Sequence, residues 1–298
     1  MSFSTQVKNE LCRAAMHRPC CIRAEAYGAL LHATIFSHRE IRLNTENAEI
    51  ARRLQLLLRR AFSVDCAPRQ AGSKIQLVLE HAEQLGHIFD ALGYDLKNHV
   101  TYHINRNVLE EDCCIAAFLR GVFLMAGTVA GPDKKSHLEL KTARHSLAGE
   151  ETSLLLDLHL SPKMTRRGST YVLYFKDGAS IEDFLTSIGA PRAAMELMEA
   201  KVEKTLRNTI NRQVNCETAN MVKAADASAR QVAAIQRVLR THGEAFFPER
   251  LRETVRLRLA YPTDSLAELA ARFDPPISKP GLSHRLKKIT ELSAAEEE

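Results

Sequence analysis

Two hydrophobic periodicities run through the first 190 residues of this chain. Apolar residues three or four apart, the spacing of an amphipathic helix, occur at 46–62, 83–93, 146–160 and 179–189. Alternating or β-branched runs, the pattern of a strand, occur at 41–45, 74–80, 137–142 and 170–176. Helical and strand-like runs follow one another in the same order in both halves. The pattern therefore predicts an α+β fold that contains a duplicated unit.

A repeated stretch of fourteen residues supports this duplication. CCIRAEAYGALLHA (20–33) and CCIAAFLRGVFLMA (113–126) are identical at seven of fourteen positions, among them Gly28 and Gly121. Each copy opens a half with the predicted order αββαββα, over about 20–93 and about 113–189. Because glycine has no side chain, two helix backbones can approach closely at these positions. We predict that the two helices pack on each other at a pseudo-two-fold axis.

The most apolar stretch, AAFLRGVFLMAGTVAG (116–131), is predicted to be a core helix rather than a membrane span. A span needs about 20 consecutive apolar residues, and Arg120 interrupts this shorter run. The N-terminal MSFSTQVKNELCR lacks the apolar core of a signal peptide and predicts an amphipathic helix with Phe3, Val7 and Leu11 on one face. We therefore expect a cytoplasmic protein with no membrane contact.

The seven cysteines are expected to be free, buried thiols. Their number is odd, and two pairs, Cys20-Cys21 and Cys113-Cys114, are sequence neighbours. The sequence contains no CxxC motif and no Cys/His cluster with the spacing of a zinc site. The expectation is therefore that the protein holds no metal and no cofactor.

Two αββαββα halves joined through small-residue helices resemble the LAGLIDADG homing endonucleases. The resemblance implies that these helices form the central interface. In that family an acidic residue near the end of each helix binds the divalent metal for DNA cleavage. Laying the motif on 26–34 and 119–127 puts those positions at Ala33 and Ala126. Alanine offers no oxygen ligand to a hard cation, so we expect no catalytic residues here.

The C-terminal third is predicted to be all-α. Residues 196–240 form one long helical pattern, which we expect to break near Asn215–Thr218, at a hinge or a capped junction within the polar run 211–220. Shorter helical segments follow at 248–260, at 265–273 with a capping-box pattern of Ser265 and Glu268, and from near Ser278 to Ile289. Asp274-Pro275-Pro276 ends the second of them. This order is typical of a helix-turn-helix.

The predicted domain organisation follows from these patterns. A LAGLIDADG-like domain occupies 1–205, a helical linker 206–230 and the helix-turn-helix domain 231–298. Lys and Arg nearly balance Asp and Glu over 1–200, at 24 against 23, but exceed them by 13 to 8 over 221–295. A positive excess in the last third indicates a polyanionic partner there.

The outward face of the last helix carries the candidate DNA-binding residues. They are Ser278, Lys279, Ser283, His284, Arg285, Lys287 and Lys288. Arg212, on the predicted long helix 196–240, is added to them as a further candidate. In the major groove, Arg285 with Ser283 or His284 is expected to read base edges, and the lysines and Arg212 to contact phosphate. The alternative is a small helical cap with a solvated basic face. The near-neutral N-terminal domain is expected to hold a protein partner, or to add non-specific contacts through Lys163, Arg166 and Arg167 in a loop.

Seven stretches spread along the chain are informative when taken together: FSTQVKNEL, PCCIRAE, FLRGVFLMAGTV, PDKKSHLEL, NRQVNCETAN, KAADASARQ and SLAELAARFDPPISKPGLSHRLKKI. Through them nearly the whole chain resembles the WhiA family of bacterial transcription regulators. The resemblance implies a degenerate homing-endonuclease domain joined to a C-terminal helix-turn-helix. It also implies binding to double-stranded DNA at the nucleoid, and a role in sporulation, cell division and chromosome segregation. The alternatives are a non-catalytic adaptor bound to nucleic acid or the chromosome, and an active endonuclease or RNA maturase.

Overall fold

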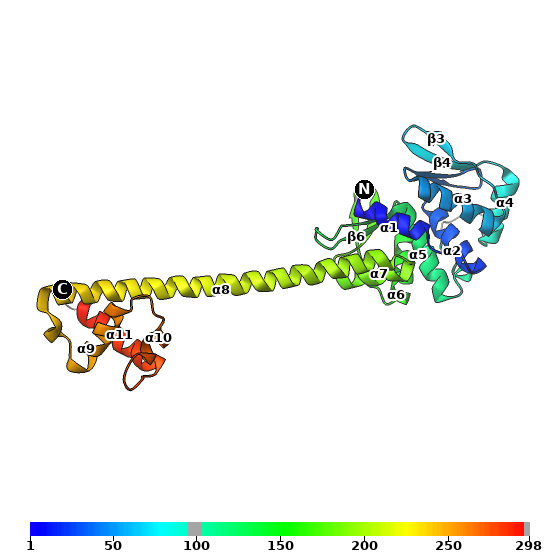
Figure 1. Cartoon of the computed structure of the whole chain (residues 1–298). Coiled ribbons are helices and arrows are strands. Elements are labelled where there is room, and N and C mark those ends of the chain that lie inside the picture. Colours follow the sequence, from blue (N-terminus) through cyan, green and yellow to red (C-terminus); the bar gives the residue numbers. More distant parts are fainter. Residues whose placement is uncertain (95–102, 295–298) are drawn as a thin grey trace. The chain divides into compact units, whose positions relative to one another are not determined.

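The computed structural model describes residues 1–94 and 103–294, which form two compact units, Met1–Lys204 and Thr205–Glu298 (Figure 1). The first unit opens with α1 (Phe3–Cys12), whose Val7 and Leu11 are buried as predicted. Its first repeat contains α2 (Pro19–Leu31), β1 (Ile35–Phe36), β2 (Ile41–Thr45), α3 (Ala48–Phe62), β3 (Arg69–Ala71), β4 (Lys74–Leu79) and α4 (Ala82–Ala91).

The second repeat has the same order of elements. It contains α5 (Asp112–Ala126), β5 (Gly127–Val129), β6 (Leu138–Thr142), α6 (His145–Asp157), β7 (Lys163–Arg167), β8 (Thr170–Phe175) and α7 (Gly178–Ile188), after a short 3-10 helix η1 (Arg106–Val108). The α+β class and the duplicated αββαββα order are therefore confirmed.

Each repeat folds into a four-stranded antiparallel sheet with one buried face. The strand orders are β1-β2-β4-β3 and β5-β6-β8-β7. Leu43 pairs with Leu77 in the first sheet and Leu140 with Leu173 in the second, and all four side chains belong to one hydrophobic core. Since successive side chains on a strand point to opposite faces, the other face of each sheet carries the polar residues.

The loop predicted around Lys163, Arg166 and Arg167 is a strand. Lys163–Arg167 is the edge strand β7, paired with β8 from Lys163↔Tyr174 to Arg167↔Thr170. The prediction was wrong because β7 has no fully buried side chain, so it lacks the apolar alternation by which a strand is recognised.

The two repeated helices, α2 and α5, form the centre of the first unit, as predicted. A Cβ atom on Gly28 would lie 2.1 Å from the carbonyl oxygen of Phe118, and one on Gly121 would lie 2.1 Å from that of Glu25. The two contacts are related by the repeat, because Glu25 and Phe118 occupy equivalent positions in the two copies. Glycine is therefore required at both positions by the close approach of the backbones.

Helix α8 (Pro191–His242) is continuous, so the predicted break near Asn215–Thr218 is wrong. The run 211–220 contains neither glycine nor proline, and nothing in it interrupts the backbone hydrogen bonds of a helix. The helix contributes Ala193 and Ala194 to the core of the first unit, and Ile235 and Val238 to that of the second.

The second unit is completed by η2 (Glu244–Phe246), α9 (Glu249–Ala260), α10 (Leu266–Ala271) and α11 (Lys279–Ala294). Its core joins α8 to side chains of the later helices, chiefly Phe247, Leu251, Val255, Leu269, Phe273, Leu282, Leu286 and Ile289. Within residues 1–94 and 103–294, no helix combines the length and the apolar character that crossing a membrane requires.

Candidate nucleic-acid interface

The helix-turn-helix is defined at both helix starts by side-chain caps. At α10 the Ser265 hydroxyl accepts from the Glu268 amide at 3.3 Å, and the Glu268 carboxylate accepts from the Ser265 amide at 2.8 Å. This reciprocal capping box is the one that the sequence predicts. At α11 the Ser278 hydroxyl accepts from the Gly281 amide at 3.2 Å. Ser278 therefore fixes the first turn of α11 despite the glycine within it.

Helix α11 has one apolar and one polar face, as predicted. Leu282, Leu286 and Ile289 are buried in the core. The candidate residues with exposed side chains are Ser278, Lys279, Ser283, His284, Lys287 and Lys288. Among them Lys287 lies 3.8 Å from Glu291, an exposed pair one turn apart. The polar face thus presents three lysines, one histidine and two hydroxyls to solvent.

Arg285 differs from the other candidate residues of α11, because it is half-buried. Its guanidinium carbon lies 5.4 Å from the centre of the Phe273 ring, in the segment between α10 and α11. A cation over an aromatic face is an attractive contact that also restricts the side chain. Arg285 is therefore held at the flank of the helix, toward the turn of the motif.

The remaining candidate, Arg212, lies in the exposed part of α8, where every residue from 201 to 226 is exposed. No described contact fixes its side chain. Arg212 and the α11 residues belong to the same unit, Thr205–Glu298.

Arg258 is a further residue of this motif that was not predicted from the sequence. Its side chain is buried, and Nη1 donates to the Asp264 carbonyl at 3.0 Å and to the Ser228 hydroxyl at 3.4 Å. Burial lowers the pKa of its guanidinium, and the Asp264 carboxylate partly offsets this effect. The contacts join α9, α8 and the segment that leads into α10. Its spacing from Leu251 and Val255, seven and three residues, places it on the apolar face of α9 and is the signal that could have revealed it.

The outer face of the second sheet carries a basic group around one carboxylate. Glu139 on β6 contacts Lys141 at 3.1 Å, Arg167 on β7 at 2.7 Å and His137 at 2.6 Å. Burial alone would raise the pKa of Glu139, but hydrogen bonds from these three groups outweigh it and hold the pKa at about 2. The exposed Lys163 on β7 faces the same side, since it is four residues from Arg167 on one strand.

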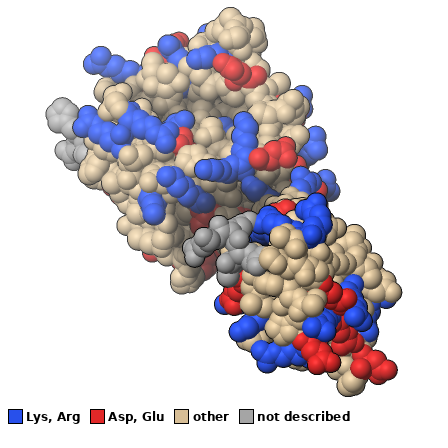
Figure 2. All heavy atoms as spheres, turned by 90° about the vertical axis from the view of Figure 1, so that its left-hand side faces the viewer, with Lys and Arg blue, Asp and Glu red and all other residues tan. Residues whose placement is uncertain are grey.

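The outer face of the first sheet is also polar and basic. Alternation along β2 and β4 puts Arg42, Asn44, Lys74 and Gln76 on this face, and Arg69 of the edge strand β3 lies opposite Gln76. Arg42 is paired with Glu40. Figure 2 shows that Lys and Arg side chains are spread over much of the visible surface, with Asp and Glu between them. A near-neutral total charge thus conceals two faces that each have a basic excess.

A pocket of about 480 Å³ lies where α2 and α5 end. It contains both alanines, Ala33 and Ala126, that replace the predicted carboxylates, and its cationic lining comes from Lys8, Lys141 and Arg144. No Asp or Glu occurs among the described residues that line it. His32 also lines the pocket, and its imidazole Nε2 lies 2.5 Å from the buried Glu151 carboxylate. Such a lining repels a divalent cation and attracts an anion.

Comparisons with protein families match both units of the chain. Residues 115–207 match the WhiA LAGLIDADG-like domain, and residues 210–293 match the WhiA C-terminal HTH domain.

Similar proteins cover the chain almost completely. A probable cell division protein WhiA of Ruminiclostridium cellulolyticum is 37% identical over 305 residues, which are 98% of this chain and 97% of the relative. Its counterpart in Alkaliphilus metalliredigens is 34% identical over 312 residues, 99% of this chain and 98% of the relative. The crystal structure of full-length DUF199/WhiA from Thermatoga maritima matches with a TM-score of 0.62 at 23% identity, over 99% of each chain. That structure shares the fold.

Proposed function

Because this chain belongs to the WhiA family, we propose that it is a sequence-specific transcription regulator that binds double-stranded DNA and has no nuclease activity. It acts in the cytoplasm at the nucleoid, in cell division, chromosome segregation and sporulation-type development. Two of its relatives bear the name of cell division proteins, which supports the first of these roles.

The polar face of α11 is the observation that carries this proposal. A recognition helix needs exposed donors on a helix that is fixed by a small core. Ser283 and His284 are exposed donors near the N-terminal end of α11, and Leu282 and Leu286 anchor the opposite face. In the proposed complex Arg285 with Ser283 or His284 reads base edges, whereas Lys279, Lys287, Lys288 and Arg212 contact phosphate.

The lining of the pocket at Ala33 and Ala126 supports the absence of nuclease activity. Cleavage in the manner of homing endonucleases needs carboxylates that hold a divalent metal at the ends of the two central helices. Here the pocket is lined by Lys8, Lys141 and Arg144 and by none of the required carboxylates among its described residues. The same cations suit a phosphate group, so the first unit adds non-specific contacts to DNA or binds an acidic protein partner.

Selection of genomic fragments by the full chain at near-physiological salt tests the proposal. We expect one shared short motif to be enriched by the wild type and to be lost in Arg285→Ala. Arg285→Lys is the matched variant, because it keeps the charge over Phe273 but not the planar fork that binds guanine bidentately. Equal binding to all fragments would instead support a chromosome-associated adaptor.

The absence of cleavage needs its own assay. Supercoiled plasmid that contains the enriched motif is incubated with the full chain and Mg²⁺ or Mn²⁺. We expect the plasmid to remain supercoiled. Metal-dependent nicking that co-purifies with the protein through two different columns would refute this part of the proposal.

A further inference from the structure

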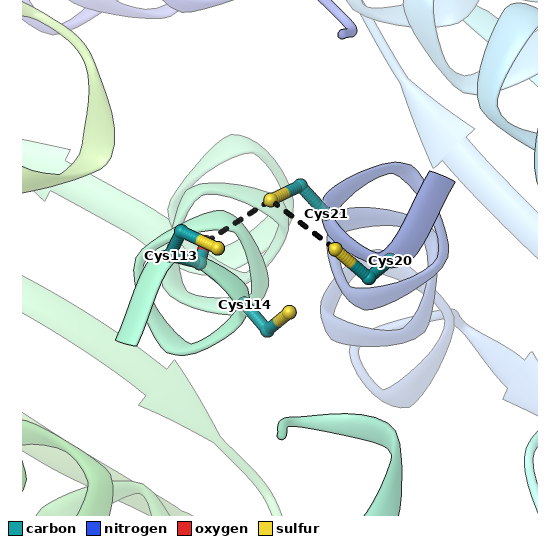
Figure 3. Close-up of side chains that lie close together, drawn as sticks. All are labelled: Cys20, Cys21, Cys113 and Cys114. Atoms are coloured by element: carbon teal, nitrogen blue, oxygen red, sulfur yellow. Dashed lines mark hydrogen bonds between the residues drawn. The ribbon is translucent and has the colours of Figure 1, made fainter. Parts of the chain in front are cut away.

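Four cysteines meet at the end of the central helix pair that lies opposite Ala33 and Ala126. Cys20 and Cys21 are in the first turn of α2, and Cys113 and Cys114 are in the first turn of α5. Because the two helices run side by side from equivalent starting points, the two sequence-neighbour pairs face each other across the interface (Figure 3). All four Sγ atoms lie within 4.8 Å of one another. The spacing of the cysteines in the sequence did not predict this group, because two of its members come from each repeat.

The sulfur positions fit the first coordination sphere of a tetrahedral ion. Four thiolates bound to zinc at about 2.3 Å lie about 3.8 Å from one another. The Sγ atoms of Cys20 and Cys21 are 4.0 Å apart, and none of the pairs in the group exceeds 4.8 Å. Side-chain rotations that shorten the sulfur–sulfur distances by about 1 Å or less therefore bring the four sulfurs to the spacing of a zinc site.

Burial raises the pKa of Cys21 and of Cys114, whereas two features of the surroundings favour negative charge on the group. A divalent ion with four thiolates carries a net charge of −2, and the starts of α2 and α5 both direct the positive ends of their helix dipoles toward the group. Arg18 adds a formal charge, because its Nη1 donates to Cys113 Sγ at 3.5 Å. Partners of this kind orient and stabilise the ligands of a metal site.

The four thiols are partly accessible to solvent, so a metal ion can reach them. Cys114 is buried, whereas Cys20, Cys21 and Cys113 are half-buried. Cys21 Sγ also lies 3.6 Å from the Cys113 carbonyl across the interface.

The main alternative to a metal site is a disulfide between two of the four cysteines. A bond within either pair would join Cα atoms about 3.8 Å apart, below the usual range of about 4.4–6.8 Å. A bond from Cys21 to Cys113 would leave two thiols unused.

We propose that Cys20, Cys21, Cys113 and Cys114 form a tetrathiolate site for one zinc ion, which ties together the N-terminal ends of the two central helices. The ion has four protein ligands and no open position, so the site is structural. It is independent of DNA binding by the second unit.

Cobalt substitution of the full chain tests the proposed site. The reduced protein is stripped of metal with a chelator and titrated with Co²⁺ in the absence of oxygen. We expect the intense visible bands of tetrahedral cobalt and the sulfur-to-cobalt charge-transfer band, both saturating at one ion per chain and abolished by one equivalent of Zn²⁺. A weak octahedral spectrum, or binding that does not saturate at one equivalent, would overturn the proposal.

Single cysteine variants identify the ligands. Cys21→Ser and Cys114→Ser should lose the charge-transfer band and bind zinc at least tenfold more weakly. Cys12→Ser is the matched control, because Cys12 is another half-buried thiol of the same unit, and Cys216→Ser is an exposed one. Equal effects in the controls would refute the assignment.

Two measurements on the wild type keep the test decisive if a ligand variant does not fold. In the ¹¹³Cd-loaded protein, the NMR resonance should lie in the range of four sulfur ligands. Protein purified without reductant should yield seven free thiols after denaturation and metal removal. A cross-link between Cys21 and Cys113 in metal-free protein, with no metal uptake after reduction, would assign the group to a disulfide instead.

Discussion

Arg120 of α5 donates from Nε to Oε2 of Glu25 on α2 at 2.9 Å, so that the one charge in the most apolar stretch of the chain is paired with a carboxylate of the other repeat. Glu25 is buried and also accepts a hydrogen bond from Arg53 of α3, whose Nη2 lies 2.8 Å from the same carboxylate oxygen. Arg53 and Arg120 in turn donate to backbone carbonyls, among them that of Ile188 at 2.9 Å from Arg120. The two repeats are thus joined by a buried ionic group as well as by apolar contacts.

Replacing Glu25 by Ala should therefore destabilise the first unit severely. Removal of the carboxylate leaves two arginines beside each other without their shared partner, and breaking such a buried group costs about 3–5 kcal/mol. Chemical denaturation of the full chain, monitored in the sheet-containing unit by near-UV circular dichroism, measures the loss.

The matched control for Glu25 is Glu49→Ala. Glu49 forms an exposed pair with Arg52 at 3.0 Å on α3, and exposed pairs contribute at most about 1 kcal/mol. If the two variants lose the same free energy of unfolding, the buried group is not a major stabilising contact.

The close approach of the central helices gives a second prediction. Gly28→Ala and Gly121→Ala each place a Cβ 2.1 Å from a carbonyl oxygen of the opposite helix, so the helices must separate. Forcing extra carbon into a packed interface costs typically about 1–3 kcal/mol, and we expect at least this loss at both positions in thermal unfolding.

Gly149→Ala is the opposite case within the same unit. Gly149 lies inside α6, and a Cβ there meets nothing within 4 Å. Alanine has a higher helix propensity than glycine by about 1 kcal/mol, so this variant should be as stable as the wild type or more stable. A destabilised Gly149→Ala together with an unaffected Gly28→Ala would contradict the geometry of the helix pair.

The sequence predicted the elements that bury an apolar face and failed where burial is absent or comes from another repeat. The hydrophobic periods located β2, β4, β6 and β8 to within one residue, because each has a buried alternation. The edge strand β7 has no such alternation, and the exposed residues 201–226 of α8, although predicted to be helical, bury no apolar face that would show the helix to be unbroken.

Contacts between distant residues set the second limit. That Cys21 lies beside Cys113 depends on the crossing of two helices 92 residues apart in sequence. The inward position of Arg258 was readable from its spacing, but its partners Ser228 and Asp264 were not. The loss of the carboxylates at Ala33 and Ala126 was predicted, whereas the pocket around them and the cations that line it were found only in the structure.

Lys8, one of the cations that line the pocket, should make the free energy of unfolding depend on pH in the alkaline range. Burial lowers the pKa of its ammonium to about 8, an effect that the nearby Cys12 partly offsets. Between pH 8 and the ordinary pKa of 10.5, the unfolded chain keeps a proton that the folded protein has lost. The free energy of unfolding therefore rises with pH across this window, and below pH 8 the full penalty of burying the charge is present.

The Lys8→Met variant removes this penalty. At pH 7 we expect it to be more stable than the wild type by roughly 1–3 kcal/mol, since one pKa unit corresponds to about 1.4 kcal/mol, and the difference should shrink between pH 8 and 10. Lys74→Met, at an exposed lysine of β4, is the control and should show no such trend. A Lys8→Met variant with the same pH dependence as the wild type would show that Lys8 remains charged and solvated.

The last prediction separates the two kinds of DNA contact proposed for α11. A lysine bound to phosphate contributes to affinity on every sequence, and its loss reduces the slope of log K against log salt by about 1. We expect this result for Lys288→Ala, whose side chain is exposed. Lys287→Ala should have a similar effect. The only described partner of Lys287 is the exposed Glu291 at 3.8 Å, and such a weak contact does not prevent Lys287 from binding a phosphate.

Arg285→Ala should behave differently in the same titrations. If it reads a base, affinity for the enriched motif falls by about 1–3 kcal/mol while affinity for unrelated DNA changes little. Since the variant also loses the contact with Phe273, thermal unfolding of each variant is measured beside the binding. The lysine variants and Arg285→Lys should retain the wild-type unfolding midpoint. Equal losses by Arg285→Ala on all sequences, with normal stability, would make Arg285 a phosphate contact and transfer base reading to Ser283 and His284.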